Sequence, residues 1–345
     1  MKPFEIGSEM VEAGTRRDLH LPFMSTPDGR DMTIPMIVIH GRRDGPVLYL
    51  NSGTHGDEPE GTLAIVDVAE ELDPSTLRGT LIGVPVLNVP AFVGKASLDV
   101  AGVRETPLDW KNLARVFPGK ADGTATERLA NAVVTQILPR VEYAIDFHSG
   151  GTRGTSHLIT GFVAADGELG RKSLELAKLF PFETLWRASP WAKFSSVCLE
   201  RGIAVAVIET SGQGRAEAED VEALKVGIRN VMTHLGMVEG TLQQIPAERV
   251  CIDTETYLYA SVGGILRPKV RTGDRIKKGA LLGSVIDFFG GVNEKILAPL
   301  DGVVTGIRTK PVVWAGDPTF LVANFIPIPQ FEVGEKKAQV NVSPP

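Results

Sequence analysis

Residues 51–61, NSGTHGDEPEG, place one histidine and three carboxylates in a glycine-rich stretch between an apolar run and a helix-like pattern. His55 and Glu58 lie three residues apart, and an imidazole and a carboxylate are both ligands that zinc accepts. The pair alone is a weak signal, because a glutamate near the start of a helix is favoured by the helix dipole in any case. The stretch therefore needs partners from elsewhere in the chain before it indicates a metal site.

Two apolar runs, YAIDFH and IAVAVIET, end in residues that could complete such a site. The first ends in Asp146 and His148, and the second ends in Glu209. Two imidazoles and one carboxylate, from His55, Glu58 and His148, form the ligand set of a catalytic zinc site that keeps one position open for water. Glu209 could then act as the base for that water. Asp146 lies two residues before His148, on the same side of a strand, and is expected to support that imidazole as a hydrogen-bond partner.

Each of these residues also has a simpler interpretation. His148 alone could be a hydrogen-bonded histidine at a strand end, and Glu209 could cap a helix or pair with an arginine. Their joint occurrence favours the metal site, since three buried-type strands end in residues with metal-binding or acid-base chemistry. The remaining histidines follow no such pattern and are interpreted as surface or packing residues: His20, His40, His157 and His234.

A second group of candidate residues lies in RETPLDWKNLARVFPG, residues 104–119. Arg104 and Arg115 are part of a loop bounded by proline and glycine, where guanidinium donors can clamp a carboxylate or polarise a carbonyl oxygen. Either arginine taken alone could equally be a solvated surface charge.

These residues must be positioned by the elements around them, and β-like and helix-like patterns alternate over residues 33–240. Strands that alternate with helices indicate an α/β fold with a mostly parallel sheet, whose ligands bind beyond the carboxyl ends of the strands. The predicted strands are TIPMIVIHG, PVLYLNSG, TLIGVPVLN, YAIDFH and IAVAVIET, and the predicted helices are PEGTLAIVDVAEEL, TATERLANAVVTQIL, DGELGRKSLELAKLF and EDVEALKVGIRNVMTHLG.

The pattern changes after about residue 245, where short β-branched stretches are separated by turn signals such as TGD, KKGA and LDG. This texture is typical of a small all-β module with tight turns. We therefore expect an α/β catalytic domain at 1–245, a β-rich module at 246–330 and a loose tail at 331–345.

Composition narrows the classes of function. The 345 residues are 43% hydrophobic and 23% charged, enough for a large core, and the net charge of −6 provides no basic surface for nucleic acid or an anionic membrane. No apolar run approaches the roughly 18 residues of a membrane span. The first residues lack a signal-peptide pattern, and Cys198 and Cys251 form no CxxC pair, so we expect a reduced, cytoplasmic protein.

Taken in order, HGDE, PVLNVPAF, RETPLDWKNLARVFPG, DFHSG and IET resemble the aspartoacylase and succinylglutamate desuccinylase family, relatives of the zinc carboxypeptidases. The resemblance covers roughly residues 33–325 and is strongest to stand-alone bacterial deacylases, among them the N-acetyl-diaminobutyrate deacetylases. It implies a mixed sheet with flanking helices, as in the zinc carboxypeptidases, followed by a C-terminal barrel-sandwich module.

The resemblance also implies roles for individual residues. His55, Glu58 and His148 match the zinc ligands, for one zinc ion per chain, and Glu209 matches the carboxylate that activates water. Arg104 matches an arginine that polarises the scissile carbonyl.

The carboxylate-binding part of the family motif is altered in this chain. Arg115 and Asn112 match substrate-binding positions, but the family has Asn-Leu-Asn-Arg where this chain has Asn112, Leu113, Ala114 and Arg115. Since Ala114 cannot donate a side-chain hydrogen bond, the carboxylate clamp is expected to be weakened or rebuilt. The family also uses a tyrosine from the C-terminal module, for which Tyr257 and Tyr259 are the candidates.

The expected reaction is hydrolysis of the amide of a small N-acyl amino acid to a carboxylic acid and a free amine. Zinc would acidify water, Glu209 would accept its proton, Arg104 would polarise the carbonyl, and Glu209 would return the proton to the amine. The expected partners are this substrate and further copies of the chain in a homo-oligomer.

Two alternatives remain at this point. A zinc carboxypeptidase would use nearly the same residues on peptides, although the C-terminal module should narrow access to the site. A non-catalytic binding or carrier protein is suggested by the resemblance of residues 283–304 to biotinyl and lipoyl domains. Gly290 and Gly291 lie near the place where those domains carry their modified lysine, which argues against a carrier.

Overall fold

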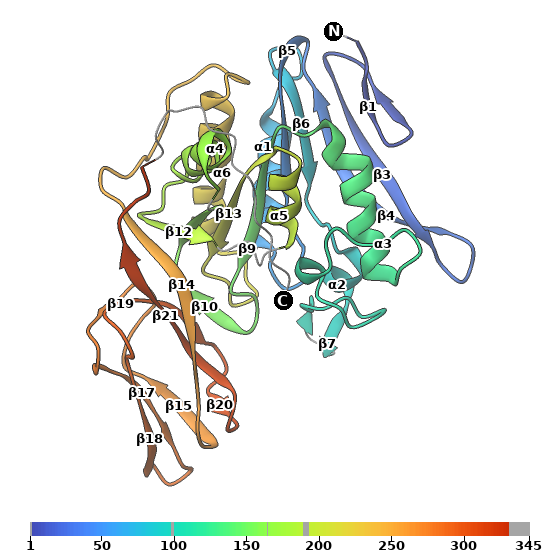
Figure 1. Cartoon of the computed structure of the whole chain (residues 1–345). Helices are drawn as coiled ribbons and strands as arrows, with labels where there is room; N and C mark the ends of the chain where they lie inside the picture. The colour runs from blue at the N-terminus through green and yellow to red at the C-terminus, as the bar shows by residue number, and fades with distance from the viewer. Residues whose placement is uncertain (1, 98–99, 164, 189–192, 331–345) are drawn as a thin grey trace.

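The computed structural model describes residues 2–97, 100–163, 165–188 and 193–330, and is built around one 13-stranded mixed sheet (Figure 1). The predicted tail at 331–345 lies outside the described residues. In spatial order the strands of the sheet are β10 (Gly154–Ser156), β19 (Gly302–Arg308), β21 (Pro318–Ile326), β14 (Val250–Tyr259), β12 (Thr184–Ala188), β11 (Ile159–Val163), β13 (Ala204–Thr210), β9 (Tyr143–Ser149), β5 (Arg43–Asn51), β6 (Arg78–Val84), β4 (Asp31–His40) and β3 (Thr15–Ser25), and β16 (Arg275–Ile276) pairs with β19.

The middle of the sheet is mostly parallel and its two sides are antiparallel. Strands β13, β9, β5 and β6 run parallel to one another, as do β14, β12 and β11. Antiparallel pairs join β11 to β13, β6 to β4 and β4 to β3. The expectation of a mixed α/β fold is therefore confirmed, while the parallel order expected from the alternation holds only in the middle.

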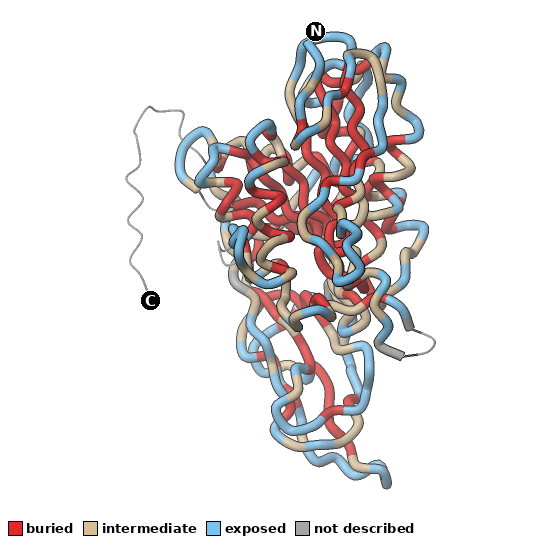
Figure 2. Tube along the Cα trace, turned by 90° about the vertical axis from the view of Figure 1, so that its right-hand side faces the viewer, coloured by how far each residue is buried: buried red, intermediate tan, exposed pale blue. Residues whose placement is uncertain are grey.

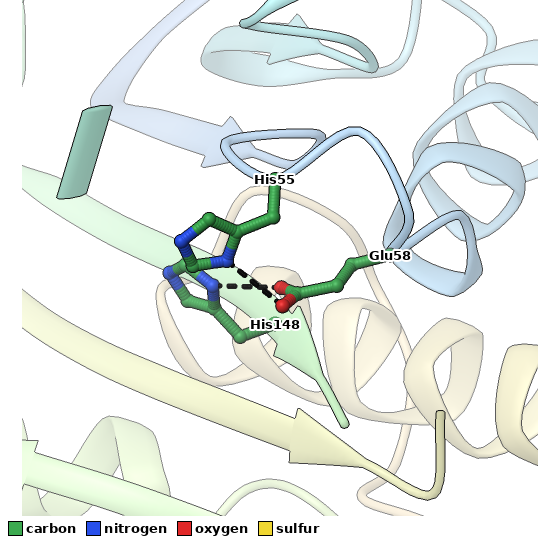
Figure 3. A group of neighbouring side chains, drawn as sticks. All are labelled: His55, Glu58 and His148. Atoms are coloured by element: carbon green, nitrogen blue, oxygen red, sulfur yellow. Dashed lines mark hydrogen bonds and ion pairs between the residues drawn. The ribbon is translucent and has the colours of Figure 1, made fainter. Parts of the chain in front are cut away.

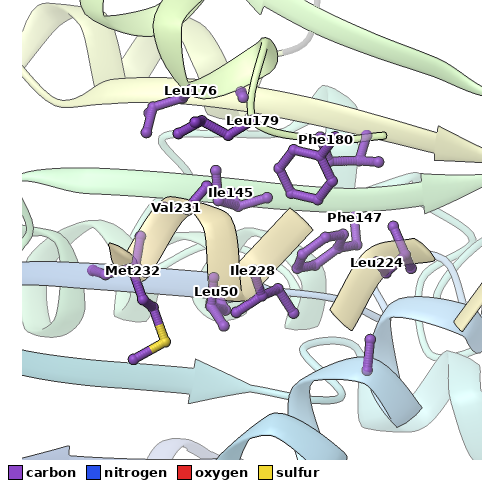
Figure 4. Packing of buried hydrophobic residues seen from close by; sticks show 14 of the residues in the cluster. Leu50, Ile145, Phe147, Leu176, Leu179, Phe180, Leu224, Ile228, Val231 and Met232 are labelled. Atoms are coloured by element: carbon purple, nitrogen blue, oxygen red, sulfur yellow. The ribbon is translucent and has the colours of Figure 1, made fainter. Parts of the chain in front are cut away.

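Helices cover both faces of the sheet, because alternate residues of its central strands are apolar in both directions. Leu48 and Leu50 face one core, with α1 (Glu60–Glu71), α4 (Gly167–Ala177) and α6 (Ala218–His234). Tyr49 faces the other core, with α3 (Ala125–Ala132) and α5 (Lys193–Glu200). Figure 2 shows these buried segments gathered along the sheet. In the first core Phe147 of β9 meets Phe180 edge to face, with ring centroids 6.1 Å apart (Figure 4).

The helices begin where the sequence carries start signals. Helix α1 follows Pro59 directly, and α3 has a capping box in which Thr124 and Glu127 each bond the other's backbone N–H. The helices are α1 (Glu60–Glu71), α2 (Val89–Val93), α3 (Ala125–Ala132), α4 (Gly167–Ala177), α5 (Lys193–Glu200) and α6 (Ala218–His234), with short helical turns η1 (Leu113–Arg115), η2 (Val133–Ile137) and η3 (Leu138–Arg140). No helix among the described residues is both long and apolar enough to span a membrane.

The C-terminal β module, residues 246–330, is joined to the main sheet through β14. The first residues of β14 pair with β12, and most of the strand pairs with β21. The module adds a four-stranded sheet and its own apolar core. In spatial order the four strands are β18 (Val292–Leu297), β17 (Leu281–Ile286), β15 (Gly264–Pro268) and β20 (Val312–Val313). Two small sheets lie outside the module: β1 (Phe4–Ile6) pairs with β2 (Glu9–Val11), and β7 (Lys95–Ser97) pairs with β8 (Val100–Ala101). The division at residue 245 stays a prediction.

Candidate metal and catalytic site

Three neighbouring parallel strands, β5, β9 and β13, carry the candidate residues at their carboxyl ends. The register pairs Glu209 of β13 with His148 of β9, and Asp146 of β9 with Asn51 of β5. The loop that follows β5 then carries His55 into the same region. Parallel pairing thus gathers residues that are up to 158 positions apart in the chain, between Asn51 and Glu209.

His55, Glu58 and His148 form the candidate metal site (Figure 3). Their ligand atoms all lie within 4.8 Å of one another. The Nδ1 atom of His55 lies 2.8 Å from one Glu58 oxygen, and the Nδ1 atom of His148 lies 2.9 Å from the other. His55 and Glu58 are buried, at 3% and 2% exposure, and His148 is partly buried, so the three groups converge below the surface.

The donor set fits a divalent cation. Two imidazole nitrogens and a carboxylate all point their electron pairs at one place, and such an arrangement needs positive charge between them, either protons or a metal ion. Burial would lower the pKa of His148, but the carboxylates of Asp146 and Glu58 raise it well above its ordinary value. Burial would likewise raise the pKa of Glu58, but the two imidazoles lower it well below its usual range. Two nitrogens and one oxygen are the ligand types of catalytic zinc.

Hydrogen bonds behind the imidazoles orient their Nδ1 atoms toward Glu58 and the candidate metal position. His148 donates from Nε2 to Asp146 at 3.1 Å, and the other oxygen of Asp146 accepts from Asn51 at 2.6 Å. His55 donates from Nε2 to the amide oxygen of Asn112 at 3.1 Å. With its hydrogen on Nε2, each imidazole can present the Nδ1 lone pair to a bound metal ion.

The loop that carries His55 packs backbone against backbone, which requires glycine. A Cβ atom at Gly56 would lie 2.2 Å from the carbonyl of Ala91, and one at Gly102 would lie 2.4 Å from the carbonyl oxygen of Gly56. Gly56 also donates its N–H to Val103 at 2.8 Å. The His55 loop is therefore held directly against the segment that leads to Arg104.

The arginine loop reaches the metal site through two of its residues. Arg104 donates to Glu58 at 2.9 Å and lines the cavity beside it. Asn112 accepts from the N–H of Ala114 and contacts His55, so its amide oxygen supports the site from behind. Arg115 is exposed at the end of η1 and is not among the described residues that line the cavity. The substrate-binding roles of Asn112 and Arg115 stay predictions.

Glu209 lies beside the metal site with its carboxylate turned to the cavity. Burial raises its pKa to about 8; the His148 imidazole lowers the pKa, and the carboxylates of Glu58 and Glu255 raise it further. Within the described part of the chain no ion pair neutralises Glu209. A partly buried carboxyl group with a raised pKa next to a metal position is suited to accept and return a proton.

A cavity of about 830 Å³ opens beside these residues, and its wall comes from both parts of the chain. Arg104 and Glu209 lie on the α/β side, and Tyr257 of β14 lies on the side of the C-terminal β module. Tyr257, but not Tyr259, is among the described lining residues, although the two rings stack with centroids 6.2 Å apart. The cavity size suits a small molecule.

Some lining residues were not expected from the sequence. Trp186 of β12, Glu255 of β14 and Thr305 of β19 contribute to the wall. The alternation in TETYLY, which turns Glu255 and Tyr257 to the same face of a strand, was the signal available for Glu255. Nothing in the local sequence distinguishes Trp186 or Thr305.

The four other histidines lie outside the metal cluster. His40 bonds Thr80 and the carbonyl of Lys2, and His157 bonds Thr184. His20 pairs with Thr33 on the surface, and His234 is the last residue of α6.

Comparison with known proteins assigns the family. The sequence pattern of the succinylglutamate desuccinylase/aspartoacylase catalytic domain matches residues 44–235, more than half of the chain. The chain is also 31% identical to N-alpha-acetyl-L-2,4-diaminobutyric acid deacetylase of Halomonas elongata over 302 residues, which cover 85% of this chain and 86% of the relative. The chain therefore belongs to the succinylglutamate desuccinylase/aspartoacylase family. The expectation of an enzyme that hydrolyses N-acyl amino acids is confirmed at the level of the family.

Solved structures agree with this assignment. The product-bound ectoine utilization protein EutE (DoeB) of Ruegeria pomeroyi matches with a TM-score of 0.80 and 27% identity, over 90% of this chain and 95% of that chain. A succinylglutamate desuccinylase/aspartoacylase of Rhodobacter sphaeroides matches with a TM-score of 0.78 and 28% identity, over the same shares of the two chains. The similarity extends beyond residue 235 and so includes much of the C-terminal β module.

Proposed function

We propose that this chain is a zinc-dependent deacylase that binds one zinc ion through His55, Glu58 and His148 and hydrolyses the amide of a small N-acyl amino acid. The observation that carries the proposal is the convergence of these ligand atoms within 4.8 Å, next to Arg104 and Glu209, which line a cavity. A zinc ion bound there would supply Lewis acidity, which lowers the pKa of water and polarises a carbonyl group.

Glu209 and Arg104 carry out the remaining chemistry in this proposal. Glu209 accepts a proton from the attacking water as the oxygen bonds to the amide carbon. Arg104 donates hydrogen bonds to the carbonyl oxygen, which becomes negatively charged. Glu209 then returns the proton to the amide nitrogen as the carbon–nitrogen bond breaks, so that a carboxylic acid and an amine leave. The position of both side chains on the cavity wall supports these roles.

The substrate carboxylate is assigned to the arginine loop. Arg115 supplies positive charge there and Asn112 a side-chain amide, whose oxygen already contacts His55. Ala114 adds no side-chain donor, so the clamp differs from that of the family pattern and is less suited to a dicarboxylic substrate. The deacetylase of Halomonas elongata, whose name specifies an N-acetylated diaminobutyric acid, supports a diamino acid in this chain as well.

The C-terminal β module is proposed to be a barrel-sandwich hybrid that narrows access to the site. Its residues Glu255, Tyr257 and Thr305 line the cavity, which supports a small substrate rather than a peptide. The free thiols of Cys198 and Cys251 support a reducing, cytoplasmic setting. The proposal also includes a homo-oligomer, as expected from the resemblance.

The proposal is tested by metal content and hydrolysis together. The purified protein should contain about one zinc ion per chain and release amine from a panel of N-acyl amino acids, and a chelator should abolish this activity. The double variant His55→Ala, His148→Ala should lose zinc, while His20→Ala, His234→Ala serves as the matched control. Full zinc retention in the first variant would place the metal elsewhere, and a zinc-loaded protein inactive on the whole panel would exclude the proposed reaction.

A further inference from the structure

Three polar side chains meet in the cavity wall on the side of the C-terminal β module. Trp186 comes from β12, Glu255 from β14 and Thr305 from β19. They lie on three different strands of the main sheet, and two of these strands belong to the module. The mechanism proposed above uses none of them.

Irregularities in two strands coincide with this wall. The pairing of β14 with β21 shifts register between Ile252 and Glu255, and the pairing of β19 with β21 shifts between Val304 and Gly306, around Thr305. A β-bulge changes the direction of the side chains beside it, and bulges occur often next to active sites. Both irregularities thus lie where a side chain is presented to the cavity.

Two polar atoms of this wall lack a well-formed hydrogen bond to the described residues. Trp186 Nε1 is buried without a partner there, and Thr305 Oγ1 lies beside the Glu255 carboxylate without meeting hydrogen-bond geometry. Burial raises the pKa of Glu255, and the neighbouring Thr305 hydroxyl offsets this only in part. Buried polar groups normally have partners, so a wall of this kind is suited to a ligand with polar atoms of its own.

Three of the cations that line the cavity are paired with other carboxylates, whereas Lys95 and Lys310 also line it and form no ion pair with Glu255 in the described part of the chain. The ion pairs are Arg104 with Glu58 at 2.9 Å, Arg153 with Glu105 at 2.7 Å and Arg308 with Asp317 at 3.1 Å. No ion pair to Glu255 occurs in the described part of the chain. The group that complements a partly buried, unpaired carboxylate beside a hydroxyl is a ligand ammonium, which donates up to three hydrogen bonds.

We propose that Glu255, together with Thr305, binds a protonated amino group of the substrate and so makes the enzyme selective for N-acyl diamino acids. This inference rests on the proposed deacylase function. Arg104 and the arginine loop would face the carboxylate and carbonyl end of such a substrate, and Glu255 would face its cationic end. Glu255 is then a specificity-determining residue of the reaction.

The test compares a cationic ligand with a neutral one of the same shape. N-acetyl-2,4-diaminobutyrate and N-acetylnorvaline differ by an ammonium in place of a methyl group, and the products 2,4-diaminobutyrate and norvaline differ in the same way. We expect the wild type to prefer the cationic member of each pair. Glu255→Gln should reduce this preference about 10- to 100-fold, mainly through KM and through the Kd of the product measured by calorimetry.

Controls separate this role from a structural one. Glu219→Gln removes an exposed carboxylate in the first turn of α6 that is not among the described residues lining the cavity, and should leave the preference unchanged. Thr305→Val should reduce the preference less, about two- to tenfold, and keeps the proposal testable if Glu255→Gln does not fold. An equal loss on cationic and neutral ligands in Glu255→Gln, or an unchanged preference, would overturn the inference.

The outcomes also distinguish the inference from the proposed function. A wild type that hydrolyses N-acetylaspartate but shows no preference for the cationic ligands contradicts the Glu255 subsite and leaves the deacylase intact. A wild type that hydrolyses no N-acyl amino acid but binds 2,4-diaminobutyrate in a Glu255-dependent way contradicts the proposed function and supports the subsite.

Discussion

Glu58 makes more contacts within the candidate site than binding a metal ion alone would require. Its two oxygens contact His55 and His148, accept from Arg104 and accept from the backbone N–H of Ser149 at 3.2 Å. At 2% exposure these contacts are shielded from water, which strengthens each of them. The carboxylate therefore links the candidate metal position to Arg104, which lines the cavity.

The first prediction at the scale of single residues concerns Glu209. Glu209→Gln should retain zinc and lose about 10²- to 10⁴-fold in kcat, because glutamine keeps the size of the side chain but cannot accept a proton. Steady-state kinetics and elemental analysis on the same preparation measure both effects. Glu219→Gln, at an exposed position in the first turn of α6, is the control and should stay near the wild-type rate. A Glu209→Gln enzyme with normal turnover would remove Glu209 from the mechanism.

A second prediction concerns the hydrogen bond behind His148. Asp146→Asn should weaken zinc binding about 10- to 100-fold, because the amide no longer stabilises the Nε2–H of the imidazole as a carboxylate does. Competition with a chromogenic chelator measures the zinc Kd. Asp109→Asn removes a carboxylate that bonds Thr126 at 2.6 Å and contacts none of the three candidate ligands, so its Kd should match the wild type. Equal zinc affinity in all three proteins would contradict the role given to Asp146.

At the scale of elements, the site depends on a loop whose backbone packs directly against the backbone of two other segments. The segment after β5 is pressed against α2 at Gly56 and against the segment before Arg104 at Gly102. Such backbone contacts leave no room for adjustment, because the neighbouring atoms are not flexible side-chain ends. The position of His55 is therefore set by the packing of two other segments.

We predict that Gly56→Ala destabilises the fold by about 1 to 3 kcal/mol and also weakens zinc binding, because the new methyl group must displace the backbone at Ala91. Urea unfolding of the apoprotein and the zinc Kd measure the two effects. Gly240→Ala is the matched control, since the nearest atom to its Cβ is the Thr233 hydroxyl at 3.4 Å. Gly56→Ala with unchanged stability and affinity would show that the loop adapts easily.

At the scale of the whole molecule, the cavity is shared between the α/β part and the C-terminal β module. Strand β14 joins the two, since it pairs with β12 at its start and with β21 along most of its length. The candidate metal ligands all come from the first part, whereas the cavity residues Glu255, Tyr257 and Thr305 come from the second. Chemistry and selectivity are thus assigned to different segments of one sheet.

Metal removal should change the stability of the whole chain. Zinc that binds only the folded state at 100 times its Kd stabilises that state by about 2.7 kcal/mol, so chelation should lower the melting temperature by roughly 4 °C for a chain of this length. Calorimetry with zinc and with chelator measures the shift. The double variant His55→Ala, His148→Ala should show no shift; an equal shift in that variant would mean that zinc stabilises the protein from another site.

Much of the fold followed from local patterns. The central strands β5, β9 and β13 and the helices α1, α3, α4 and α6 were predicted close to their observed bounds, because each has an apolar period and clear end signals. Strands β1, β2, β3, β11 and β12 and helix α5 were not predicted. Strand β3 alternates polar and apolar residues weakly and contains a proline, and it owes its place to pairing with β4.

The sequence by itself determined which residues could bind a metal and that they would lie at strand ends, because ligand type, spacing and periodicity are local properties. Only the tertiary structure decided which atoms meet: that Arg104 bonds Glu58, that Asn112 supports His55, and that Glu255 lines the cavity with no ion pair among the described residues. These contacts join residues that are 46 and 57 positions apart in the chain, or strands that become neighbours only when the sheet forms. They depend on register and on packing between distant segments, which no short stretch of sequence encodes.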